Sequence, residues 1–108
     1  EEIMIENVLL KLGILNDHTS DEYSRVELFV EDAERAIKIA IRKSSVPKEL
    51  EWICEEMAVV RYRKFGSEAA KSETVDGYSV TFVDDMIAPY KTILDDYVAS
   101  AGRKLRTL

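Results

Sequence analysis

Residues 19–43, TSDEYSRVELFVEDAERAIKIAIRK, carry the clearest helix start in the chain. Thr19 and Glu22 stand three positions apart, as in a capping box with Thr19 as the N-cap. Apolar residues then recur at helical spacing and form a stripe wide enough to contact more than one other helix. The sequence therefore predicts a helix over residues 20–43 at the centre of a helical domain.

Two shorter helical patterns flank this stretch. Residues 3–12 carry apolar side chains on one helical face, and Gly13 follows them, in a position that suits the left-handed residue after a helix. Pro47 suits the start of a third helix, because the first helical position needs no backbone N–H, and the stripe of this helix continues to Gly66. Two apolar residues fall off that stripe and are expected to face outward: Trp52 and Val59.

Residues 66–83 interrupt the helical pattern. Two β-prone runs, 71–75 and 78–82, flank the dipeptide Asp76-Gly77, which is favoured in type I′ turns, and they predict a β-hairpin. A last helix then starts at Asp84 or Asp85 and ends at Gly102. The predicted fold class is mainly all-α: one domain over residues 1–108, a four-helix bundle-like arrangement with a β-hairpin between the third and fourth helices.

Composition narrows the class of protein. The chain has 108 residues, a net charge of −6 and a pI near 4.8, which argues against a dedicated nucleic-acid-binding domain. The single cysteine, Cys54, excludes an internal disulfide and a multi-cysteine zinc site, and it suits a reducing compartment. No apolar run is long enough to span a membrane. These features predict a small, acidic, intracellular domain.

Catalytic residues are not evident in the sequence. His18 lies in a polar loop, and Cys54 lies on the apolar stripe of the third helix, where a buried small side chain is the ordinary interpretation. Adjacent acidic pairs such as Glu55-Glu56 diverge on a helix and do not converge on one ion. No glycine-rich phosphate loop is present. We therefore expect no catalytic, metal-binding or cofactor-binding residue, no cofactor, and no enzyme activity.

Partner binding is the more plausible role for three features. The hairpin either folds against its own helices or orders by adding its edge to a neighbouring chain. The basic cluster over residues 61–64 suits the helix dipole better than a nucleic-acid contact, whereas the basic C-terminal tail, set against an acidic body, suits docking onto an acidic surface. The predicted partner-binding residues come from the hairpin, the third helix and the tail: Val75, Tyr78, Val80, Phe82, Trp52, Arg103, Lys104 and Arg106.

The run GSEAAKSETVDGYSVTF at residues 66–82 resembles the hairpin of tailed-phage head–tail connector proteins, the small adaptors that dock beneath the portal. Ala69 stands where many members carry a second glycine. Further segments match in the same order: LKLGI at 10–14, EDAE at 31–34, Pro47, YRKFG at 62–66 and YKTILDDY at 90–97. The resemblance covers nearly the whole chain, and its motifs are structural.

The resemblance implies a structural adaptor in the neck of a bacteriophage or prophage-encoded virion. Its copies would form a ring beneath the portal and extend the channel through which double-stranded DNA passes without sequence-specific binding. The implied partners are the portal protein, neighbouring copies and a downstream neck or tail-completion protein, with no membrane. The implied location is the head–tail junction of a virion made in the bacterial cytoplasm. Two alternatives stay open: a small cytoplasmic helical regulator that binds one protein through its hairpin, and an enzyme subunit without its own active site.

Overall fold

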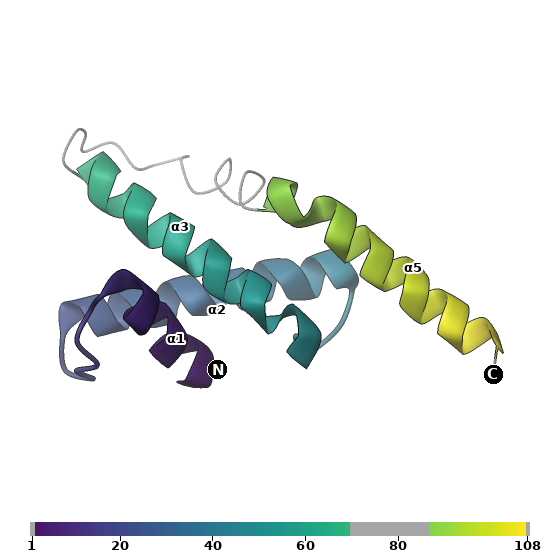
Figure 1. Ribbon diagram of the computed structural model, residues 1–108, viewed down its shortest axis with the longest axis horizontal. Coiled ribbons are helices and arrows are strands. Elements are labelled where there is room, and N and C mark those ends of the chain that lie inside the picture. The colour runs from purple at the N-terminus through teal and green to yellow at the C-terminus, as the bar shows by residue number, and fades with distance from the viewer. Residues whose placement is uncertain (1, 70–86, 108) are drawn as a thin grey trace.

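The computed structural model describes residues 2–69 and 87–107. These residues form four α-helices, with a short 3₁₀ turn ahead of α3 and another ahead of α5 (Figure 1). The elements in chain order are α1 (Glu2–Leu12), α2 (Asp21–Ile41), η1 (Lys48–Leu50), α3 (Glu51–Ala69), η2 (Ala88–Tyr90) and α5 (Lys91–Thr107). The molecule is elongated, with extents of 51 × 29 × 19 Å.

The predicted fold class needs correction. A mainly helical domain is observed, but a four-helix bundle-like domain with a β-hairpin is wrong as a description of this fold: residues 2–69 and 87–107 form helices and contain no strand. Residues 71–82, for which the hairpin was predicted, lie outside the described residues. The β-propensity of two short runs was a weak basis for the prediction, because it depends on packing context and an isolated hairpin is only marginally stable.

Two of the three helix ends predicted from a glycine were placed too early. The helix α3 passes through Gly66 and continues to Ala69, and α5 passes through Gly102 and continues to Thr107. A glycine inside a helix costs about 1 kcal/mol relative to alanine, which weakens the helix without ending it. Glycine marks a helix end only where the backbone turns left-handed, and Gly13 is the glycine that does so among the described residues.

The start of α2 is set by a serine hydroxyl one residue later than predicted. Ser20 is the N-cap, and its Oγ accepts a hydrogen bond from the backbone N–H of Tyr23 at 3.0 Å. Thr19, the predicted cap, instead donates from its N–H and its hydroxyl to Oδ1 of Asp17, at 3.0 and 2.7 Å. Asp21 then opens the helix with negative charge at the positive end of its dipole.

Two helices end in the same backbone motif. After α1, Gly13 adopts φ 71°, and the N–H of Ile14 bonds to the carbonyl of Leu9 at 3.0 Å, as predicted for a glycine-terminated helix. After α2, Arg42 adopts φ 58°, and the N–H of the next residue bonds to the carbonyl of Lys38 at 3.1 Å. Arg42 therefore holds a left-handed conformation that ordinarily favours glycine, at a cost of about 1–2 kcal/mol.

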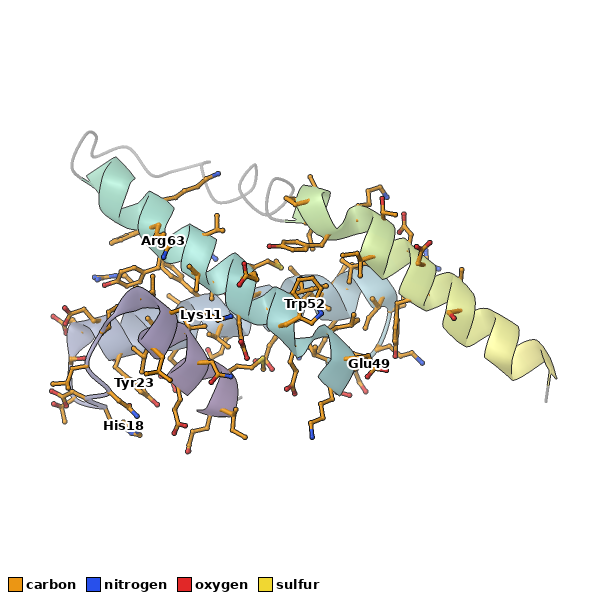
Figure 2. The ribbon with its side chains drawn as sticks, in the orientation of Figure 1. Lys11, His18, Tyr23, Glu49, Trp52 and Arg63 are labelled. Carbon is orange, nitrogen blue, oxygen red and sulfur yellow. The ribbon has the colours of Figure 1, made fainter. Side chains whose placement is uncertain are left out.

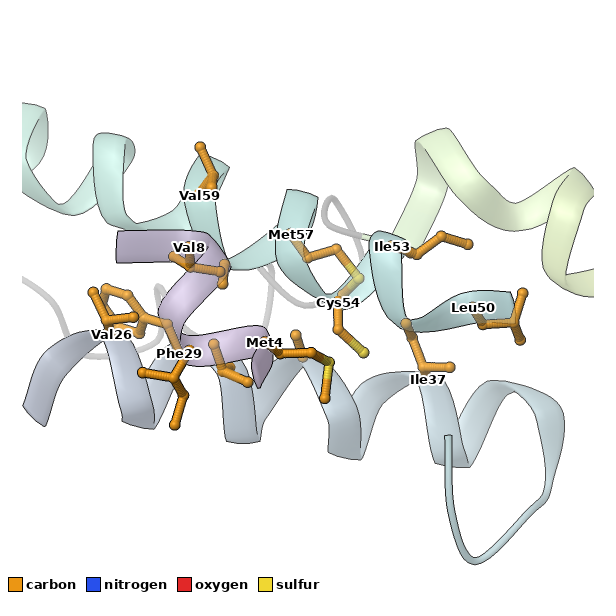
Figure 3. Close-up of a cluster of buried hydrophobic side chains, with 14 of the residues drawn as sticks. Met4, Val8, Val26, Phe29, Ile37, Leu50, Ile53, Cys54, Met57 and Val59 are labelled. Carbon is orange, nitrogen blue, oxygen red and sulfur yellow. The ribbon is translucent and has the colours of Figure 1, made fainter. Parts of the chain in front are cut away.

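The core lies where α2 and α3 pack against each other, with α1 covering both (Figure 3). The helix α5 joins this core through Leu94, which is buried, and packs mainly on α2. The C-terminal half of α5 then extends past the end of α2 (Figure 1). Val59 was expected to face outward, and this is wrong: it is buried, because α1 lies against the side of α3 that carries Glu55, one turn away.

Candidate functional site

The two side chains that could have suggested catalysis have structural environments. His18 is exposed, and its ring stacks on Tyr23 with centroids 4.4 Å apart. Cys54 is fully buried, and burial together with nearby glutamates raises the pKa of its thiol to about 12. A thiol with this pKa is neither a nucleophile nor a metal ligand at neutral pH. Residues 2–69 and 87–107 contain no group of histidine, cysteine and carboxylate side chains arranged to hold a metal ion.

A polar cluster joins α1 to α3. The carboxylate of Glu55 is buried, and it accepts hydrogen bonds from Nδ2 of Asn7 at 2.9 Å and from Nζ of Lys11 at 3.2 Å. Lys11 also reaches the carboxylate of Glu56 at 3.3 Å. Partial burial alone would lower the pKa of Lys11, but its bonds to the two carboxylates raise it overall. The cluster satisfies a buried charge and fixes α1 on α3.

A cation–aromatic cluster joins α2 to α3 near the last turns of α3. Arg61 donates to Asp32 at 2.6 Å, and its guanidinium lies 4.8 Å from the ring centre of Phe29. Arg25 lies 4.6 Å from the ring centre of Phe65, and the two phenylalanine rings are 6.0 Å apart. Arg61 belongs to the basic cluster predicted over residues 61–64, so part of that cluster holds helices together.

Trp52 is the predicted partner-binding residue whose surroundings the structure describes most fully. It faces outward as predicted, is 46% exposed, and meets the ring of Tyr90 edge-on at 6.0 Å. Tyr90 is partly buried, and burial and the charge of Glu56 raise the pKa of its hydroxyl. The pair joins the start of α3 to η2, and the exposed part of Trp52 (labelled in Figure 2) leaves aromatic surface open to solvent, which is typical of protein contacts.

The other predicted site residues fall elsewhere in the chain. Val75, Tyr78, Val80 and Phe82 lie outside the described residues. Arg103, Lys104 and Arg106 belong to the last turns of α5, at the end of the molecule where the chain terminates. The structure does not bring this tail next to Trp52, which lies near the middle of the molecule (Figures 1 and 2).

Sequence reasoning missed one charged surface, at the connection between α2 and α3. Four cations gather there: Lys38, Arg42, Lys43 and Lys48, here called the basic turn. Lys38 is partly buried and the others are exposed, and none of the four makes an ion pair with another described residue. The signal was available, because the run from 38 to 48 contains no acidic residue in a chain of net negative charge.

Comparison with known proteins identifies the family. A family model described as phage gp6-like head-tail connector protein matches residues 2–97. No curated protein and no solved structure matches the chain. Within the part of the chain that the structure describes, no helix combines the length and the apolar character needed to cross a bilayer. The match covers most of the sequence, and it agrees with the family resemblance of the connector-like segments. The chain therefore belongs to the phage gp6-like head–tail connector family.

Proposed function

We propose that this connector protein is a neck adaptor whose copies form a ring beneath the portal and extend the channel for double-stranded DNA. The observation that carries the proposal is the family match over residues 2–97, which supports a place at the head–tail junction. In this role the chain contacts the portal, its own neighbours and a downstream neck or tail-completion protein. It would be made in the bacterial cytoplasm and incorporated into the virion.

Two physical properties support this role. The elongated helical body exposes aromatic surface at Trp52 and Tyr90, and α5 extends beyond the core, so the molecule offers contact surface along its length. The net charge of −6 suits a channel wall, because like charge prevents phosphate neutralisation and keeps DNA from adhering. Neither property requires a reacting group, in keeping with a structural role.

Assembly on the portal tests the proposal. The purified chain, purified portal rings and their mixture are compared by size-exclusion chromatography with light scattering. We expect the mixture to give a complex that contains several copies of the chain per portal ring, whether or not the chain is a monomer alone. A mixture in which portal and chain elute separately, at concentrations well above micromolar, would contradict the proposal.

The Trp52→Ala variant adds a residue-level test of the same role. Loss of an exposed aromatic side chain at a contact weakens binding by more than 1 kcal/mol at hot spots. The matched control is Ile3→Ala, which removes an apolar side chain that is 70% exposed on α1. We expect Trp52→Ala to reduce binding to the portal complex about tenfold, and Ile3→Ala to leave it nearly unchanged. If both variants bind the portal equally well, Trp52 is not part of the contact surface.

A further inference from the structure

The cations of the basic turn differ from several other cations of the protein because they form no ion pair with a described residue. Lys11, Arg35, Arg61 and Lys91 each pair with a carboxylate within 4.0 Å, and Arg25 lies over an aromatic ring. By contrast, the cations of the basic turn have no acidic partner among the described residues. The nearest acids in the sequence, Glu49 and Glu51, stand in the first turns of the following helix, where negative charge complements the dipole.

An opposite charge gathers at the other end of α2. Asp17, Asp21 and Glu22, here called the acidic end, surround the start of that helix. Asp21 and Glu22 are exposed and make no ion pair with any described residue. Asp17 accepts hydrogen bonds from Thr19 and keeps its negative charge, because those bonds lower the pKa of its carboxyl.

The two surfaces cannot meet within one molecule. The helix α2 has 21 residues, so about 30 Å separates its ends. Figure 1 shows the connection from α1 to α2 at one end of the long axis and the connection from α2 to α3 toward the other. The last turns of α5 lie farther along the long axis than the connection from α2 to α3 (Figure 1).

We propose that the basic turn of one copy docks on the acidic end of the next copy. This rests on the proposed ring and names the surfaces that would form its subunit contact. The charges are complementary, neither the cations of the basic turn nor Asp21 and Glu22 form an ion pair with another described residue, and their placement at opposite ends of α2 makes the contact heterologous. Heterologous contacts between identical chains close into rings when the rotation between copies permits. Charge pairs of this kind set the orientation and the rate of association, and salt weakens them.

DNA is the other polyanion that four cations could contact. A phosphate contact would have to form against the repulsion of a chain of net charge −6, which slows the approach of any polyanion. A second copy carries the same net charge, but its negative charge is concentrated at the acidic end, so the basic turn can meet it in one orientation while the other charges stay farther apart. DNA binding by the basic turn is a separate outcome of the test.

Charge reversal tests the contact. The reversed-turn variant is Lys43→Glu/Lys48→Glu, which leaves the left-handed residue Arg42 in place. The reversed-end variant is Asp21→Lys/Glu22→Lys, and the fourfold variant combines both pairs of changes. Assembly on portal rings is measured by light scattering at low and at physiological salt. We expect each double variant to assemble about tenfold or more weakly at low salt, and the fourfold variant to recover because its reversed surfaces complement each other again.

Controls separate this contact from general effects of charge and folding. Arg63→Glu/Lys91→Glu makes the same change in net charge away from the basic turn and should change assembly less than about twofold. Helical circular dichroism checks that each variant is folded. Rescue in the fourfold variant is the decisive result, since a misfolded chain would not recover on further substitution.

Several outcomes overturn the inference. Normal assembly of the reversed-turn variant overturns it and leaves the proposed function standing, as does a folded fourfold variant that fails to recover. If the reversed-turn variant assembles normally but binds double-stranded DNA more weakly than the unmodified chain in a gel-shift assay, the basic turn is a phosphate-binding surface instead. Failure of the unmodified chain to assemble on the portal contradicts the proposed function itself, and the inference then falls with it.

Discussion

Replacing Arg42 by glycine is expected to stabilise the protein. Arg42 closes α2 at φ 58°, a conformation that costs an L-residue about 1–2 kcal/mol and costs glycine almost nothing. The closing hydrogen bonds come from backbone N–H groups, so they survive the change. Glycine also makes the unfolded chain more flexible, which offsets about 0.4–1 kcal/mol of the gain. The net expectation is a rise in the free energy of unfolding of about 0.5–1 kcal/mol.

Urea and thermal unfolding followed by circular dichroism measure this change. A gain of this size should raise Tm by about 2–6 °C for a domain of this length. Gly13→Ala is the matched opposite change, because Gly13 adopts φ 71° and an added Cβ would meet no atom within 4 Å. Its effect therefore reports backbone conformation alone, and a loss of about 1 kcal/mol is expected. If Arg42→Gly were neutral or destabilising while Gly13→Ala destabilised as expected, the strain argument at Arg42 would be refuted.

Three further predictions concern buried groups. Lys11→Met removes one of the donors to the buried carboxylate of Glu55 and should lower the free energy of unfolding by about 1–2 kcal/mol in urea titrations. Lys91→Met is the control, and it should lower the free energy of unfolding by less than about 0.5 kcal/mol because its partner Asp95 is exposed. The thiol of Cys54 should resist a thiol reagent at pH 8 in native buffer and react fully in denaturant; rapid native labelling would contradict its burial. Because the pKa of this thiol is about 12 when folded and near 9.0 in the unfolded chain, the folded state holds the proton longer. The free energy of unfolding should therefore fall as pH rises from 9.0 toward 12, and Cys54→Ala should make that fall shallower in Tm measurements across this range.

Much of the helical framework was predictable because helix periodicity and helix-end chemistry are local signals. The apolar stripe of the second helix, the left-handed Gly13 and the outward position of Trp52 follow from residues within a few positions of one another, and all three are observed. The N-cap of α2 was less certain for the same reason. Thr19 and Ser20 are adjacent hydroxyl residues, and the choice between them depends on Asp17, which takes both donors of Thr19.

The errors come from contacts between helices and from glycines read in isolation. Val59 lies off the stripe that faces α2, yet α1 covers that side of α3, and periodicity in one helix cannot show where a third helix packs. Gly66 and Gly102 were taken as helix ends although their neighbours favour continuation. The hairpin combined a turn dipeptide with two β-prone runs, a pattern that does not specify what a strand would pack against.

Charged residues show most clearly what a linear sequence leaves out. Lys11 and Arg61 reach carboxylates 44 and 29 residues away, so their neutralisation depends on how α1, α2 and α3 pack. The sequence drew attention to the cluster over residues 61–64 because its cations are adjacent, but Arg61 is held between two helices. The basic turn was not recognised in the sequence, because its cations are spread over residues 38–48. In the fold, Arg61 of the adjacent cluster is paired with Asp32, whereas the dispersed cations form no ion pair with another described residue. A cation that is not paired within its own molecule is available to bind a second molecule.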